Sequence, residues 1–91
     1  MPEVYRNFGF LFFFYSREHE PIHIHVEGEE GLLIYDLIED QFVLREKKGK
    51  IKASSKRKIE ESLIENKQLI IDKWNEYFGE KIEWYEKDLV W

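Results

Sequence analysis

The 91-residue sequence contains no cysteine, only two prolines and a single methionine. Without cysteine, the protein has no disulfides, thiolate metal sites or thiol nucleophiles. Its main apolar stretch, residues 8–15, is far shorter than the roughly 20 residues that a helix needs to cross a bilayer. No small-residue cleavage site of a signal peptide follows this stretch. We therefore expect a cytoplasmic protein with no membrane segment.

The composition favours one folded domain over residues 1–91. Hydrophobic residues make up 43% of the chain and aromatic residues 16%, which is enough apolar surface to offset the entropy of the chain. The net charge of −5 argues against a general polyanion binder. Residues 47–58 are an exception, because this segment holds seven basic residues and no acidic one.

Short apolar patterns predict a sheet followed by a helix. Strands are expected in five segments, numbered 8–15, 22–27, 32–38, 42–45 and 82–86. Glycines near residues 28–31 and a turn at Asp40–Gln41 predict short antiparallel connections. Ser54 or Ser55 is expected to cap the helix, and Gly79 to end it. The apolar face of this helix is predicted from residues at helical spacing, namely Ile59, Leu63, Ile70, Trp74 and Tyr77, with Asn66 interrupting the stripe. The expected fold class is α+β, a small antiparallel sheet packed against one long C-terminal helix, with the segment 89–91 as an apolar tail.

All three histidines lie within residues 19–25. His23 and His25 are two apart on a predicted strand, so they project from the same face, opposite the apolar Ile24. His19 precedes them on a predicted loop. Three imidazoles in one window suit three different roles. They serve as general acid and base in phosphodiester cleavage, they bind a metal such as zinc, or they belong to a half-exposed, protein-binding face of the sheet.

The basic segment predicts a phosphate site at the start of the helix. Lys56, Arg57 and Lys58 fall in its first turn, where cations oppose the helix dipole, and Lys52 lies just before it. A bound phosphate would relieve that conflict and use the free backbone N–H groups. The alternative is an ordinary solvated surface, neutralised by acidic residues further along the helix. These acidic residues are Glu60, Glu61 and Glu65.

The spacing Ser16-x-x-His19-x-x-x-His23-x-His25 resembles the hallmark of a prokaryotic family labelled domain of unknown function 4160. The resemblance extends over most of the chain, from an aromatic strand before Ser16 to a late helix that carries a Trp. Pro21 falls two residues before the middle histidine here, whereas family members often place it directly before. The resemblance implies a toxin–antitoxin-like setting with a small cognate protein encoded alongside. It implies no established activity and no assigned catalytic residues.

These observations lead to one main hypothesis and two alternatives. In the main hypothesis the protein is the toxin side of such a pair and acts on RNA or another phosphodiester. His19, His23 and His25 would transfer protons, while Lys52, Lys56, Arg57 and Lys58 hold phosphate. The first alternative makes the same three histidines a metal site. The second makes the protein a non-catalytic, antitoxin-like binding module, so the sequence leaves open whether it is an enzyme.

Overall fold

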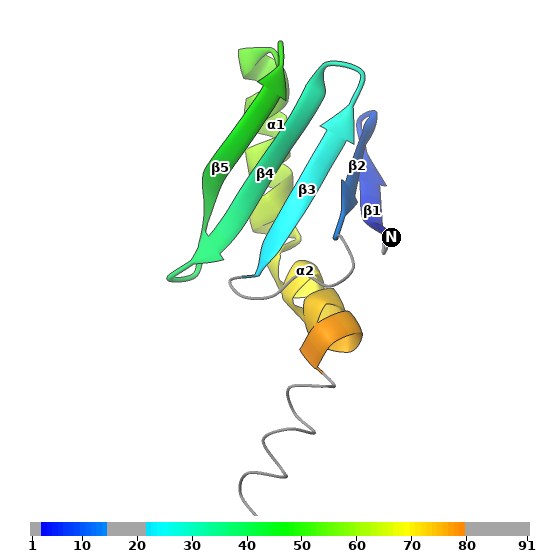
Figure 1. The fold of residues 1–91 in the computed structure, drawn as a ribbon, viewed down its shortest axis with the longest axis vertical. Helices are drawn as coiled ribbons and strands as arrows, with labels where there is room; N and C mark the ends of the chain where they lie inside the picture. The colour runs from blue at the N-terminus through cyan, green and yellow to red at the C-terminus, as the bar shows by residue number, and fades with distance from the viewer. Residues whose placement is uncertain (1–2, 15–21, 80–91) are drawn as a thin grey trace, which may run out of the picture.

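A computed structural model describes residues 3–14 and 22–79 of the chain. The described part forms an antiparallel sheet with helices on one face and at one end of it (Figure 1). The elements in chain order are β1 (Glu3–Asn7), β2 (Phe10–Phe13), β3 (His23–Gly28), β4 (Gly31–Ile38), β5 (Gln41–Gly49), α1 (Ala53–Glu65), α2 (Lys67–Trp74) and the π-helical turn η1 (Asn75–Gly79). The predicted α+β class is confirmed.

The strands of the sheet stand in the same order as in the sequence, β1-β2-β3-β4-β5, and each neighbouring pair is antiparallel. Strands β3 and β4 match their predicted positions closely. Strand β5 extends beyond the predicted residues 42–45, because the lysines that follow continue along the exposed edge of the sheet. The predicted strand 82–86 and the segment 89–91 lie outside the described residues.

Strand β1 was not predicted, because its sequence lacks a regular apolar alternation. Val4 and Tyr5 are adjacent, and a β-bulge between Glu3 and Tyr5 shifts the register at this point. Phe8 was expected in a strand but forms the β1–β2 turn with Gly9, at φ values of 37° and 85°. Two positive φ values in a two-residue connection match the right-handed twist of antiparallel strands. The β4–β5 turn is built in the same way, one residue earlier than expected, at Glu39–Asp40 with φ values of 49° and 70°.

The single long helix of the prediction is two helices. Asn66 separates α1 from α2, with backbone angles of φ −106° and ψ 17°. Its side-chain Nδ2 donates a hydrogen bond of 2.9 Å to the carbonyl oxygen of Ser62. Asparagine competes in this way with the helical backbone ladder, which explains both the break in the helix and the break in the apolar stripe. No helix in residues 3–14 and 22–79 is long and apolar enough to cross a membrane.

The hydrophobic core lies between one face of the sheet and the two helices. Its strand residues are Phe10, Phe12, Ile24, Val26, Leu33 and Tyr35, and its helix residues are Ile59, Leu63, Ile70 and Trp74. Phe14, directly after β2, also belongs to it. Ile51 completes the cluster. Four of the five residues predicted for the helix face are therefore buried, whereas Tyr77 is exposed. Tyr77 lies in the turn η1, where the helical spacing on which its prediction rested no longer holds.

Strand β1 is attached to α1 through one buried hydroxyl. The Tyr5 hydroxyl is hydrogen-bonded to Ser62 Oγ at 2.8 Å, and Asn7 Nδ2 donates to the same oxygen at 3.2 Å. Ser62 is buried, and partial burial raises the pKa of the Tyr5 phenol despite this hydrogen bond. Buried polar groups that are satisfied in this way fix the position of an edge strand on a helix.

Candidate functional site

Histidines 23 and 25 lie on the face of the sheet that points away from the core, as the alternation of strand β3 predicts. Ile24 between them is fully buried among the core residues. In the register of the sheet, His25 stands directly between Phe13 of β2 and Ile34 of β4. The sheet thus presents both imidazoles on one rigid strand, flanked by strands on both sides.

The two imidazoles are close together and buried among aromatic rings. Their ring centroids are 5.7 Å apart, with an angle of 67° between the ring planes. The His25 ring stacks on Phe13 at 5.2 Å, and the His23 ring meets the edge of Trp74 at 5.3 Å. Each histidine is only 3% exposed. Both side chains are therefore buried, whereas one of the alternatives placed them on a half-exposed face of the sheet.

Two other polar groups border this region. Asp36 stands opposite His23 in the register of β3 and β4. Its carboxylate accepts hydrogen bonds from Arg45, at 2.6 Å from Nη2 and 3.0 Å from Nε. His19, the third residue of the predicted cluster, lies outside the described residues. Among residues 3–14 and 22–79, no group of three or more metal-ligating side chains is assembled.

The start of helix α1 differs from the prediction. Lys52 is the N-cap residue, and neither Ser54 nor Ser55 caps the helix with its side chain. Instead, the carboxylate of Glu30, in the turn between β3 and β4, reaches this end. It accepts a hydrogen bond from the Lys52 backbone N–H and another from the Ser55 hydroxyl, both of 2.9 Å. An anion does occupy the helix N-terminus, as the dipole favours, but it belongs to the protein itself.

The four basic residues predicted to hold phosphate do not meet the histidines. Lys56 forms an ion pair of 2.9 Å with Glu60, one of the acidic helix residues expected to neutralise the segment. Lys52, Arg57 and Lys58 are exposed around the start of α1. Helix α1 covers one face of the sheet (Figure 1), the face on which the core residue Ile24 lies. The imidazoles alternate with Ile24 along β3 and so project from the other face. The structure therefore brings His23 and His25 together but places the cations in a separate region.

Replacing Glu30 with glutamine is expected to make stability less dependent on pH. The hydrogen bond from Lys52, followed by that from Ser55, lowers the pKa of the Glu30 carboxyl. Because the folded-state pKa is depressed, Glu30 stabilises the fold above its ordinary pKa, and this contribution is lost as pH falls through the lowered value. The melting temperature of Glu30→Gln should thus lie below that of the wild type near neutral pH and approach it in acid.

Thermal melts across the acid range measure this effect, with Glu29→Gln, in the same turn, as the matched control. Glu29 is exposed, so the melting temperature of Glu29→Gln should vary with pH as that of the wild type does. A difference between Glu30→Gln and the wild type that stays constant down to the acid limit would contradict the role of the ionised carboxylate.

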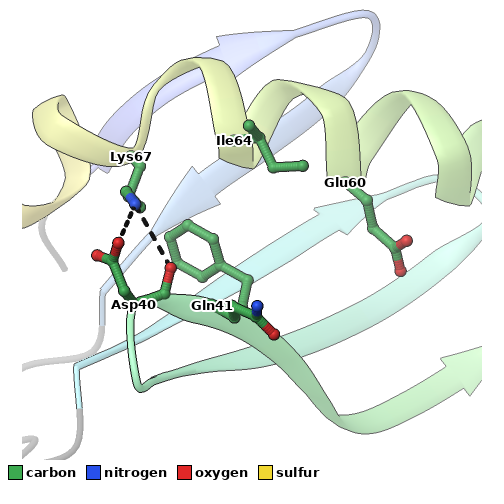
Figure 2. A pocket seen from close by; sticks show the side chains of 6 residues that line it. Asp40, Gln41, Glu60, Ile64 and Lys67 are labelled. Carbon is green, nitrogen blue, oxygen red and sulfur yellow. Dashed lines mark hydrogen bonds and ion pairs between the residues drawn. The ribbon is translucent and has the colours of Figure 1, made fainter.

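A groove between α1 and the β4–β5 turn was not predicted. It has a volume of about 350 Å³ and is lined by Asp40, Gln41, Phe42, Glu60, Ile64 and Lys67 (Figure 2). The Lys67 ammonium is 2.8 Å from the Asp40 carboxylate across one end of the groove. The Glu60 carboxylate, at the other end, accepts a 2.9 Å hydrogen bond from the Tyr35 hydroxyl. One sequence signal for this groove is Ile64, an apolar residue that falls outside the predicted helix stripe.

Comparison with known proteins supports the resemblance of the histidine motif to a known family. The family model for DUF4160, a domain of unknown function, matches residues 9–75. No curated protein and no solved structure matches the chain. The matched range includes all three histidines, the residues that line the groove, and the whole of helices α1 and α2. Because the match covers well over half of the sequence, the chain belongs to the DUF4160 family.

Proposed function

We propose that the histidine motif is a metal-binding site, with His23 and His25 as two of its ligands and His19 as the third. The observation that carries this proposal is the distance between the two described imidazoles. A tetrahedral zinc with Zn–N bonds of about 2.1 Å places the centroids of two bound imidazoles roughly 5 Å apart. The centroids of His23 and His25 are 5.7 Å apart, so small side-chain rotations bring both rings to one ion.

Burial favours a metal over direct chemistry on RNA. Both imidazoles are 3% exposed, so the backbone of a folded or single-stranded RNA has no direct approach to them. A single ion is small enough for such a site. The aromatic neighbours Phe13 and Trp74 form the kind of apolar shell that controls the environment of a bound metal. The Asp36 carboxylate, bonded to Arg45, is less suited to serve as a further ligand.

The proposed site is tested by titrating metal-free protein, purified without an affinity tag, with zinc. We expect one zinc per chain and a rise in melting temperature on binding, because a ligand of the native state stabilises it. Loss of a residue that only supports a metal ligand lowers metal affinity by up to about 100-fold. His23→Gln and His25→Gln each remove a ligand itself, so zinc affinity should fall by at least about 100-fold. The variant Phe13→Leu, which alters the shell and keeps both imidazoles, should bind zinc within about tenfold of the wild type. Equal zinc affinity in the wild type and both histidine variants would exclude the site.

A second candidate function, proton transfer on a phosphodiester by the same histidines, is favoured by the seven basic residues in 47–58. These cations suit a polyanion, but they lie away from the imidazoles, so they would supply affinity and not the chemistry itself. The samples of the zinc titration also separate this candidate. Cleavage of a single-stranded RNA by metal-free protein, lost in His23→Gln, would favour proton transfer over a metal site. In either case we propose a cytoplasmic member of a toxin–antitoxin-like pair that works with a small cognate protein.

A further inference from the structure

Strand β5 forms one edge of the sheet and is unevenly protected against pairing with another chain. Among the described residues it pairs only with β4. It has a β-bulge at Arg45, because Ile34 pairs with Glu46 whereas the next residue, Tyr35, pairs with Leu44. Lys47 and Lys48 follow the bulge. Bulges and lysines are the usual means by which an edge strand avoids pairing. Residues 41–44, Gln-Phe-Val-Leu, precede the bulge and carry no charge.

The other edge lacks such a stretch. Strand β1 is short, has a bulge between Glu3 and Tyr5, and carries an exposed ion pair between Arg6 and Glu3. Bulges and charges of this kind discourage pairing along an edge. Of the two edges in the described sheet, the first half of β5 is therefore the more open to another strand.

The groove lies beside this open stretch of β5. Phe42 and Gln41 line it from the sheet, and Ile64 lines it from helix α1 (Figure 2). Ile64 is 71% exposed, more than any other large hydrophobic residue in the described part of the chain. A side chain on an added strand that points toward α1 would enter the groove and cover Phe42 and Ile64. The backbone edge and the apolar groove are thus suited to one and the same ligand.

The charges around the groove are mainly negative. Glu60 lies at one end, bonded to Lys56 and to the Tyr35 hydroxyl. Partial burial raises the pKa of its carboxyl, but the contacts with Lys56 and then Tyr35 together outweigh this and lower it. Asp40, at the other end, is exposed and paired with Lys67. Glu39 in the turn and Glu61 on the helix add two exposed acidic residues nearby. These four acidic residues form an acidic rim around the groove, and basic side chains on a ligand would complement it.

We propose that residues 41–44 and the adjoining groove bind an extended segment of a partner protein, which adds a strand to the sheet and directs apolar and basic side chains toward α1. Strand addition of this kind takes affinity from main-chain hydrogen bonds and specificity from alternate side chains. The apolar side chains would contact Ile64 and Phe42, and the basic ones would reach the Glu60 carboxylate. A partner bound here would leave the histidine face free.

Charge complementarity favours a partner protein over two other occupants. The segment 80–91 of this chain has four acidic and two basic residues, so it matches the acidic rim poorly. Two copies of the protein pairing through β5 would bring two acidic rims together, and like charges at an interface are unfavourable. A basic, apolar segment from another protein meets neither obstacle.

The proposal is tested on the full chain, labelled with ¹⁵N, by titration with two nine-residue peptides. Both have threonine at even positions. At odd positions one alternates valine with lysine and the other valine with glutamate. We expect the lysine peptide to shift the amide signals of residues 41–44 in a saturable manner, and the glutamate peptide to bind at least about tenfold more weakly. The Ile64→Ser variant should bind the lysine peptide about tenfold more weakly than the wild type. The matched control is Leu69→Ser, which replaces an exposed leucine on α2 and should leave the affinity unchanged.

Three results would overturn the proposal. The first is the absence of saturable shifts at residues 41–44 with the lysine peptide. The second is equal binding by the wild type and Ile64→Ser, because the groove would then take no part. The third is a shift of the same amide signals with protein concentration in the absence of peptide, which would assign the edge to a second copy of the chain.

Discussion

Alanine at position 31 is expected to lower the free energy of unfolding by about 3–5 kcal/mol, from strained backbone plus steric overlap. Gly31 has a φ of +146°, a conformation that side chains rarely adopt. A Cβ atom there would overlap the carbonyl oxygen of Lys48 and lie 3.0 Å from Cα of Gly49. Because these are backbone atoms of the paired strand, they have little freedom to move away. The first pair of the β4–β5 ladder, Gly31 with Gly49, would therefore separate.

The loss should extend beyond this pair, since Gly31 follows Glu30, whose carboxylate accepts a hydrogen bond from the Lys52 N–H at the start of α1. Urea denaturation measures the effect, with Gly9→Ala as the matched control. Gly9 also has a positive φ, of 85°, but an added Cβ meets no atom within 4 Å, so only the backbone cost of about 1 kcal/mol applies. If Gly31→Ala and Gly9→Ala lower the free energy of unfolding equally, β4 and β5 do not approach as closely at Gly31 as described.

Truncating Leu63 to alanine is expected to cost about 2–5 kcal/mol, whereas truncating its neighbour Ile64 should change stability by no more than about 0.5 kcal/mol. Leu63 is fully buried in the core beneath the sheet, and its loss leaves a cavity that the surrounding residues fill only partly. Ile64 is 71% exposed on the same turn of α1. The two variants have nearly the same effect on helix propensity, so their difference reports burial.

Urea denaturation of Leu63→Ala and Ile64→Ala provides this measurement. The two curves are analysed with the same dependence of the unfolding free energy on urea concentration. Similar losses in both variants would mean that α1 is rotated about its axis relative to the sheet. That result would also remove the groove, because its apolar wall depends on Ile64 facing outward.

Patterns within single elements predicted much of the fold. The alternation around Ile24 placed His23 and His25 on the face opposite the core, and the helical spacing of Ile59 and Leu63 identified the core face of α1. Such patterns depend on side-chain direction, which the strand and the helix each fix locally. They do not indicate how deeply a face is buried, so the burial of both imidazoles was not predictable.

Features that depend on contacts between distant residues were missed. The carboxylate at the N-terminus of α1 comes from Glu30, more than 20 positions before the helix, and no local motif indicates it. Strand β1 is held by Ser62 of α1 and by its pairing with β2, in place of an apolar pattern of its own. The break at Asn66 was visible as an interrupted stripe, but a single asparagine is also found within continuous helices. The metal site and the role of the basic segment remain predictions.

The order of the strands has a consequence for how the chain folds. Since every strand pairs with its neighbour in sequence, the sheet is a meander, and its turns β1–β2, β3–β4 and β4–β5 each close a short loop at low entropic cost. These hairpins are able to form early, and topologies rich in local contacts fold fast. The N-terminus of α1 is hydrogen-bonded to the Glu30 carboxylate, which lies in the turn of the central β3–β4 hairpin. This contact of the helix is therefore complete only once that hairpin has formed.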